Sequence, residues 1–252
     1  MRDFGPTDAP LAPHAEPLDG PFVTGLGDLA REHGCTIVAG MFESDGRELP
    51  FNTLVVVGPD GAVRTAYRKL HLYDAFGYAE SDRMAAGDNP PVSFTLDGLS
   101  VGLLTCYDLR FPELSRALAA DGADLLVVPA AWVRGPLKEE HWSTLLRARA
   151  IENTCYVAAA AQCGPRYSGR STLIDPLGVT VCALGEQVGE CQGEVRDERI
   201  AEVRERNPTL RHRRFTVSMH RTDPVTGAGY TAHEPDAAGG PSTGTGVAGT
   251  WP

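Results

Sequence analysis

The chain of 252 residues lacks several features that would indicate a membrane or secreted protein. No stretch approaches the ~18 consecutive apolar residues that a membrane-spanning helix needs. The N-terminus shows no signal-peptide pattern. The six cysteines are spread along the chain without any C-x-x-C pair, unlike the spacing of secreted disulfide frameworks or zinc sites. Together these absences predict reduced cysteines and a cytoplasmic location.

The chain is also poor in positive charge. It has 23 Lys and Arg against 33 Asp and Glu, for a formal net charge of −10. No basic cluster offsets this charge, so neither a nucleic-acid nor an anionic-membrane partner is expected. The only lysines are Lys69 and Lys138. A lysine kept in such a chain is more often one whose amine is needed, although codon bias alone could leave two.

Helix and strand patterns alternate along the chain and predict an α/β layered fold. Helical patterns cover 21–33, 112–120, about 141–153 and a charged segment that ends at Pro208. The segment 52–69 predicts a hairpin, because Pro59-Asp60-Gly61 has turn chemistry. Further strand patterns cover 35–43, 92–96, 99–106, 123–130, 155–163, 171–175, 179–184 and a short piece at 193–195.

The composition divides the chain into two regions. Residues 1–215 carry these patterns and are predicted to form one domain. From residue 219 onward Gly, Thr, Pro, Ala and Ser dominate, with few apolar residues. Such a composition cannot bury enough apolar surface to fold, so 219–252 is predicted to be a disordered tail.

The stretch "VGLLTCYDLRFPE" places one cysteine, Cys106, where a buried strand gives way abruptly to polar residues. A helical pattern follows from Pro112, so Cys106 lies at a strand-to-helix junction. A thiol at such a junction is accessible as a nucleophile, and the backbone N–H of Tyr107 can point at a developing oxyanion. A lone cysteine with apolar neighbours is more often a small core residue. The polar residues that follow Cys106 favour the nucleophile.

Other charged residues fit this chemistry but also have simpler interpretations. Lys69, in "YRKLHLYD", could stabilise an oxyanion and lower the pKa of Cys106, or could be a solvated lysine at a strand end. Glu80, in "YAESDR", is either a second carboxylate of the site or a surface charge. Asp108 and Arg110 could pair to hold the turn after the cysteine, or Arg110 could contact a substrate.

Four motifs occur in order: "YRKLHLYD", "CYDLRFPE", "KEEHWSTLLRARAIEN" and "GRSTLIDPLG". On these motifs the chain resembles the nitrilase superfamily, the carbon–nitrogen hydrolases, from about Pro17 to about Arg214. The resemblance implies an α-β-β-α sandwich with a Glu-Lys-Cys triad, assembled as homodimers or larger homo-oligomers. It implies that Cys106 is the nucleophile and Lys69 the oxyanion-stabilising lysine. Glu80 then matches a further glutamate that orients the lysine or the substrate.

The resemblance also carries expectations about binding. Arg110 and Trp132 are predicted to bind the substrate, and the backbone of Tyr107 to help to hold the oxyanion. Arg166 and Arg170 stay open as further candidates for a substrate carboxylate. The chemistry needs no metal or organic cofactor.

One part of the family pattern has no match in the printed sequence. The glutamate of the triad normally belongs to a "PE" pair that precedes the segment beginning "MRDFGPTDAP". Glu16 matches a position without a catalytic duty in the family, so it is not assigned as the base. The first β-α-β unit, ~30 residues or more, is also unmatched. We therefore expect Met1 to be an internal methionine of a longer natural protein, and a sheet without those strands to show a bare apolar edge.

These observations predict hydrolysis of a small amide through a cysteine thioester, with release of ammonia. The predicted substrates are ω-amides of small dicarboxylic acids or deaminated glutathione, followed by N-carbamoyl amides and, after these, nitriles. A catalytically inactive family member that acts through oligomeric assembly is the alternative from another class. A papain-like peptidase with a Cys–His dyad is the weakest, because no spacing supports it.

Overall fold

The structure, a computed structural model, describes residues 4–6 and 9–216. The predicted tail therefore lies outside the described residues. The helices are α1 (Pro21–His33), α2 (Pro112–Ala120), α3 (Lys138–Asn153) and α4 (Asp197–Arg206), with short 3-10 helices at Ala12–His14 (η1), Glu80–Asp82 (η2) and Cys106–Arg110 (η3). The strands are β1 (Ile37–Glu43), β2 (Phe51–Val57), β3 (Val63–Arg68), β4 (Asp74–Ala75), β5 (Tyr78–Ala79), β6 (Ser93–Leu96), β7 (Leu99–Leu103), β8 (Leu125–Ala130), β9 (Tyr156–Ala161), β10 (Thr172–Ile174) and β11 (Thr180–Ala183).

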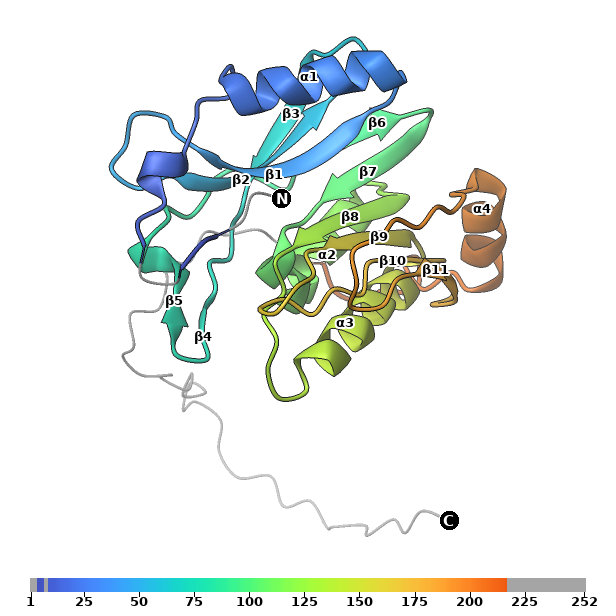
Figure 1. Ribbon diagram of the computed structural model, residues 1–252. Coiled ribbons are helices and arrows are strands. Elements are labelled where there is room, and N and C mark those ends of the chain that lie inside the picture. Colours follow the sequence, from blue (N-terminus) through green and yellow to red (C-terminus); the bar gives the residue numbers. More distant parts are fainter. Residues whose placement is uncertain (1–3, 7–8, 217–252) are drawn as a thin grey trace, which may run out of the picture. The chain divides into compact units, whose positions relative to one another are not determined.

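Two main sheets carry the described part of the chain. The first is antiparallel, in the order β1-β2-β3, and the second has the order β11-β10-β9-β8-β7-β6. Within the second sheet β7, β8 and β9 run parallel, while the outer strands pair antiparallel. Figure 1 shows α1 along the first sheet, and α2 and α3 along the second. This arrangement of helices on two sheets confirms the expected type of α/β fold.

The alternation of side chains along β2 shows how the first sheet is buried on both sides. Leu54 and Val56 join the largest core cluster, which also contains residues of β7, β8, α2 and α3. Val55 and Val57 point the other way and pack with Val23 of α1. The apolar run of β2 is therefore explained by burial on both of its faces.

Most expected elements form where the sequence patterns place them. α1 and α2 match the predicted ranges, and α1 ends at Gly34 in the left-handed conformation that glycine favours, with φ of 59°. α3 begins at Lys138 rather than near His141, because Glu139 and Glu140 lie in its first turn, where acidic side chains favour a helix.

Two expectations for the elements were wrong. The short strand expected at 193–195 is not a strand; Val195 instead packs as a partly buried residue with the cluster around Leu173 and Ile200. The segment 73–91, expected to be a plain loop, contains the small hairpin β4-β5 and η2. That hairpin matters for function, because it carries Glu80 into the interior.

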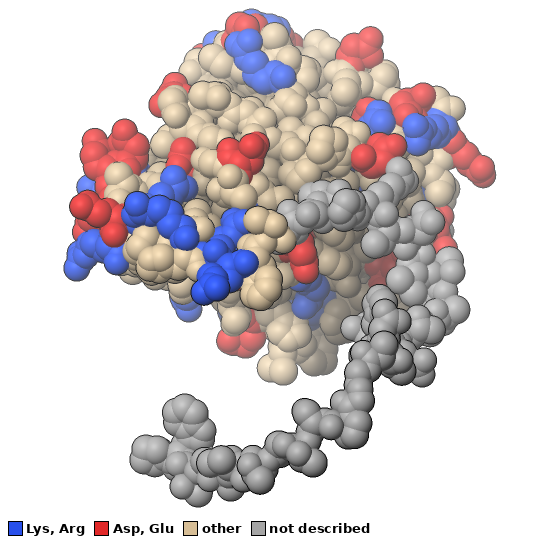
Figure 2. All heavy atoms as spheres, turned by 180° about the vertical axis from the view of Figure 1, so that it is seen from behind, with Lys and Arg blue, Asp and Glu red and all other residues tan. Residues whose placement is uncertain are grey.

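The surface carries charges of both signs. On the face in Figure 2, acidic and basic side chains occur in mixed groups separated by uncharged surface. Within residues 4–6 and 9–216, no helix is both long enough and apolar enough to cross a membrane.

Candidate active site

A cavity of about 560 Å³ collects residues from both sheets and from the segments that follow their strands. Its size lies in the range of small-molecule binding sites. Cys106, Lys69 and Glu80, which the sequence singled out separately, all line it. The other lining residues used below are Asn52, Tyr73, Phe76, Tyr107, Ala131, Trp132, Arg134, Lys138, Arg166 and Tyr167.

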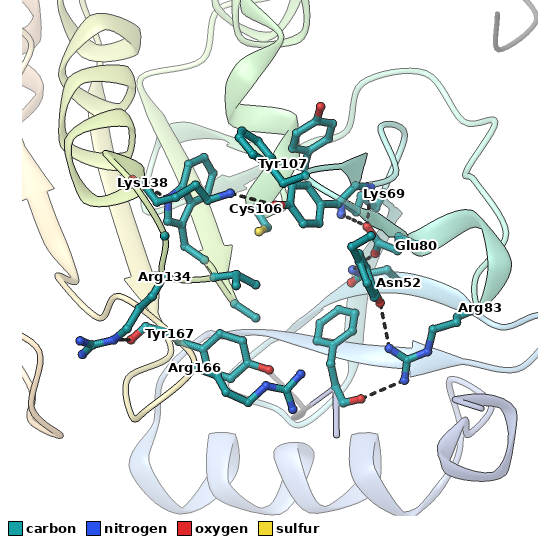
Figure 3. A pocket seen from close by; sticks show the side chains of 18 of the residues that line it. Asn52, Lys69, Glu80, Arg83, Cys106, Tyr107, Arg134, Lys138, Arg166 and Tyr167 are labelled. Carbon is teal, nitrogen blue, oxygen red and sulfur yellow. Dashed lines mark hydrogen bonds and ion pairs between the residues drawn. The ribbon is translucent and has the colours of Figure 1, made fainter. Parts of the chain in front are cut away.

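Cys106 follows the end of β7 and opens η3. Its backbone has φ of +47°, an uncommon conformation for a residue other than glycine. Thr105 caps η3, and Asp108 accepts a hydrogen bond from the backbone N–H of Thr105 at 2.9 Å. Figure 3 shows the sulfur of Cys106 directed into the cavity. The tight turn after the strand thus presents the thiol as the sequence predicts for a nucleophile.

The buried carboxylate of Asp108 holds this turn. It accepts hydrogen bonds from the hydroxyl of Tyr67 at 2.8 Å and from the backbone N–H of His71 at 3.1 Å. The Nδ1 atom of His71 also lies 2.7 Å from Asp108. The suggested pairing of Asp108 with Arg110 is not formed: Arg110 contacts His141 instead, at 3.3 Å. Asp108 therefore connects the segment of Lys69 to the cysteine turn.

Lys69 and Glu80 form a buried ion pair, with 2.5 Å between Nζ and Oε2. Both residues are almost fully buried, with exposed fractions of 2% and 1%, so neither is a surface charge. Glu80 also accepts from the backbone N–H of Tyr73 at 2.7 Å and from the Asn52 amide at 3.0 Å. Three donors thus hold the carboxylate, and the carboxylate fixes the ammonium of Lys69.

The electrostatics of Cys106 come from opposing effects. Burial raises the pKa of the Cys106 thiol above its ordinary value, and Glu80 acts in the same direction. Lys69, the backbone N–H of Ala131 and Lys138 act in the opposite direction, because each stabilises the thiolate. Burial alone would lower the pKa of Lys69, but Glu80, Cys106 and Asp108 raise it, so Lys69 is held as a cation.

The predicted binding residues divide into two groups. Trp132, Tyr107 and Arg166 line the cavity. Arg110 is half-buried but is not a lining residue, although its guanidinium lies 5.0 Å from the centre of the Trp132 ring. Arg170 is also absent from the lining, and its backbone carbonyl accepts from the Trp142 indole.

Sequence reasoning missed Lys138, which lines the cavity close to Cys106. In Figure 3 it lies across the cavity from Lys69 and Glu80, with Cys106 between. The available signal was the scarcity of lysine, since both lysines of the chain line this cavity. Among the described residues, no group of three or more His, Cys, Asp and Glu is arranged to hold a metal ion.

Comparison with known proteins identifies the family. The model of the carbon–nitrogen hydrolase family matches residues 5–205. The chain belongs to the carbon–nitrogen hydrolase family. A relative, the deaminated glutathione amidase of Escherichia coli O157:H7, is 47% identical over 204 residues, which are 80% of this chain and 76% of that protein.

Solved structures agree with this membership. A CN-hydrolase superfamily protein from Xanthomonas campestris superposes with a TM-score of 0.75 at 31% identity, over 83% of this chain and 80% of that one. An amidase from Nesterenkonia sp. AN1 has a TM-score of 0.61 at 33% identity, over 66% of this chain and 63% of that one. That amidase was seen with the acetamide moiety of fluoroacetamide added covalently at its active site cysteine. The carbon–nitrogen hydrolase is thus confirmed in family and in type of fold.

Proposed function

We propose that this carbon–nitrogen hydrolase cleaves a small amide through a thioester on Cys106 and releases ammonia. The observation that carries the proposal is the convergence of Cys106 with the buried Lys69–Glu80 pair in one cavity. A relative with a covalent adduct on its active site cysteine supports the same role for Cys106. Relatives named deaminated glutathione amidase support an ω-amide or a deaminated glutathione as the substrate.

In the proposed reaction, Sγ of Cys106 attacks the amide carbonyl and forms a C–S bond. The carbonyl oxygen becomes an oxyanion beside the ammonium of Lys69 and the N–H of Tyr107, which belongs to the first turn of η3. The C–N bond then breaks, and the nitrogen takes up a proton and leaves as ammonia. Water hydrolyses the thioester, which gives the carboxylic acid and restores the thiol.

Glu80 is proposed to position Lys69 rather than to accept the thiol proton. It is the one carboxylate that lines the cavity among residues 4–6 and 9–216. Its oxygens already accept from Lys69, Tyr73 and Asn52. A carboxylate satisfied by three donors is a weak proton acceptor, because each donor favours the ionised form. The resemblance assigns the proton transfer to the further glutamate of the triad.

Ammonia release tests the proposal directly. We expect the protein to release ammonia from at least one of succinamate, glutaramate and deaminated glutathione, and Cys106→Ala to abolish this release. Cys35→Ala is the matched control, because Cys35 is exposed and does not line the cavity. Amide hydrolysis that survives Cys106→Ala would contradict the assignment of the nucleophile.

A second candidate is a family member that acts through homo-oligomeric assembly without turnover. The observation that favours it is the absence of an unoccupied carboxylate in the lining contributed by the described residues. No ammonia from any amide, N-carbamoyl amide or nitrile, together with a stable oligomer, would favour assembly over catalysis.

A further inference from the structure

Lys138 is a buried cation without a carboxylate partner. Its exposed fraction is 5%, and it lies in the wall of the cavity. Its ammonium donates to the hydroxyl of Tyr73 at 2.9 Å, but it forms no ion pair with any described residue. Burial lowers the pKa of Lys138, and Arg110 lowers it further. A buried charge is costly unless an anion or several hydrogen bonds compensate it, so the site is incomplete as it stands.

A second cation increases the positive potential at this end of the cavity. Arg110 likewise forms no ion pair within the described residues, and its buried Nε atom has no hydrogen-bond partner there. Both cations lie over the ring of Trp132: Nζ of Lys138 is 5.2 Å and Cζ of Arg110 is 5.0 Å from the ring centre. Two neighbouring cations repel each other, so an anion bound between them and the cavity would relieve an existing strain.

The aromatic residues around Lys138 fix its position. Nζ lies 4.7 Å from the centre of the Tyr73 ring and 4.4 Å from that of Phe76. Rings of this kind stabilise a cation weakly compared with a carboxylate, but they exclude water from it. An ammonium has three donors, and Tyr73 takes one of them. The remaining donors are available to a ligand.

The backbone around Lys138 is also held in place. Its carbonyl accepts from the Trp132 indole at 2.7 Å, and its N–H donates to the carbonyl of Gly135. The preceding Leu137 has φ of 58°, which is unfavourable for a bulky residue. Such a conformation persists only where surrounding contacts impose it, which is typical of binding sites. The ammonium is thus preorganised at a fixed place beside Cys106.

We propose that Lys138 binds the carboxylate of the amide substrate and so determines its specificity for anionic amides, with Arg110 adding to the positive potential. This inference rests on the proposed amide hydrolysis. Lys69 cannot serve the same purpose, because Glu80 already neutralises it. The reactive carbonyl then lies between Lys69 and Lys138, with the amide end at Cys106 and the carboxylate end at Lys138.

The test compares two amides of four carbons, succinamate and butyramide, which differ in having a carboxylate or a methyl group at the far end. For Lys138→Met we expect the KM for succinamate to rise at least tenfold, with kcat changed less than threefold. The kcat/KM for butyramide should stay within threefold of that of the unaltered protein. Lys138→Arg keeps the charge and should restore most of the affinity for succinamate.

A binding experiment separates this inference from the proposed function. Titration calorimetry with succinate should give a dissociation constant at least tenfold higher for Lys138→Met than for the unaltered protein. Arg206→Met is the matched control, because it also removes a cation, but one that is exposed on α4 and outside the lining. Loss of succinate binding without any amide hydrolysis would support the role of Lys138 while rejecting the proposed function.

Three results would overturn the inference. The first is an equal loss of kcat/KM for succinamate and butyramide in Lys138→Met, which would indicate a role in stabilising the Cys106 thiolate or the fold. The second is unchanged succinate binding in that variant. The third is an unaltered protein that hydrolyses butyramide as efficiently as succinamate.

Discussion

At the scale of single residues, the site depends on charges that are buried in pairs or left single. Lys69 and Glu80 neutralise each other out of contact with water, whereas Lys138 has no such partner within the described residues. The paired charges are fixed and serve the reacting carbonyl. The single charge is available to a ligand, and this difference distinguishes the two ends of the cavity.

The Lys69–Glu80 pair should be strongly coupled. Glu80→Gln leaves a buried ammonium without its partner, so we expect the free energy of unfolding to fall by about 3–5 kcal/mol. Lys69→Met should cost a similar amount, because Glu80 is then unpaired. The double variant should lose clearly less than the sum of the two, which urea denaturation of all four proteins would measure. Additive losses would show that the pair does not interact.

Alkylation of Cys106 should depend steeply on pH. Because burial raises the pKa of the thiol above its ordinary value, the thiolate is a minor species at neutral pH and increases as pH rises. The rate with iodoacetamide should therefore grow about tenfold per pH unit from pH 6 to 9, since only the thiolate reacts. Peptide mapping by mass spectrometry measures this rate, with the exposed Cys35 as the control for reagent access. A plateau below pH 8 would contradict a raised pKa.

At the scale of elements, the contact of α1 with the turn between β2 and β3 makes a distinctive prediction. A methyl group on Gly27 would lie 2.8 Å from the backbone carbonyl oxygen of Gly61, whereas one on Gly25 would meet nothing within 4 Å. Gly27→Ala should therefore destabilise the protein by about 1–3 kcal/mol through overpacking. Gly25→Ala, in the same helix, should stabilise it by up to ~1 kcal/mol.

Thermal denaturation of the two variants tests this contact. A loss of ~1 kcal/mol lowers the midpoint by about 2–4 °C in a protein of this size. A rise in midpoint for both variants would mean that α1 is not pressed against the turn.

The elements show how far sequence reasoning reaches. Local signals such as Pro112 before α2 and Gly34 after α1 predict helix ends well, because capping is decided by neighbouring residues. The burial of Glu80 could not be predicted in this way, because it depends on Asn52 and Lys69, which are distant in sequence. Lys138 was missed for the same reason: its place beside Cys106 follows from how α3 begins, which no local pattern gave.

At the scale of the whole molecule, the family resemblance predicts a homo-oligomer. Within the described residues, β1 pairs with a strand only on the β2 side, and Glu16 bridges its other edge only at Glu43. Exposed strand edges of this kind are usually covered by another chain or segment. We expect light scattering coupled to gel filtration to give an even multiple of the chain mass at micromolar concentration. A single chain mass over the whole concentration range would contradict this prediction.

The central claim is that Cys106 forms a covalent acyl-enzyme, and acid-quenched mass spectrometry tests it most directly. The protein is mixed with succinamate, quenched within the first turnovers and digested. The account predicts that the peptide containing Cys106 gains the mass of the substrate's acyl group, that the addition is lost on treatment with hydroxylamine, and that Cys106→Ala shows none. Ammonia release without any acyl group on Cys106 would contradict the account.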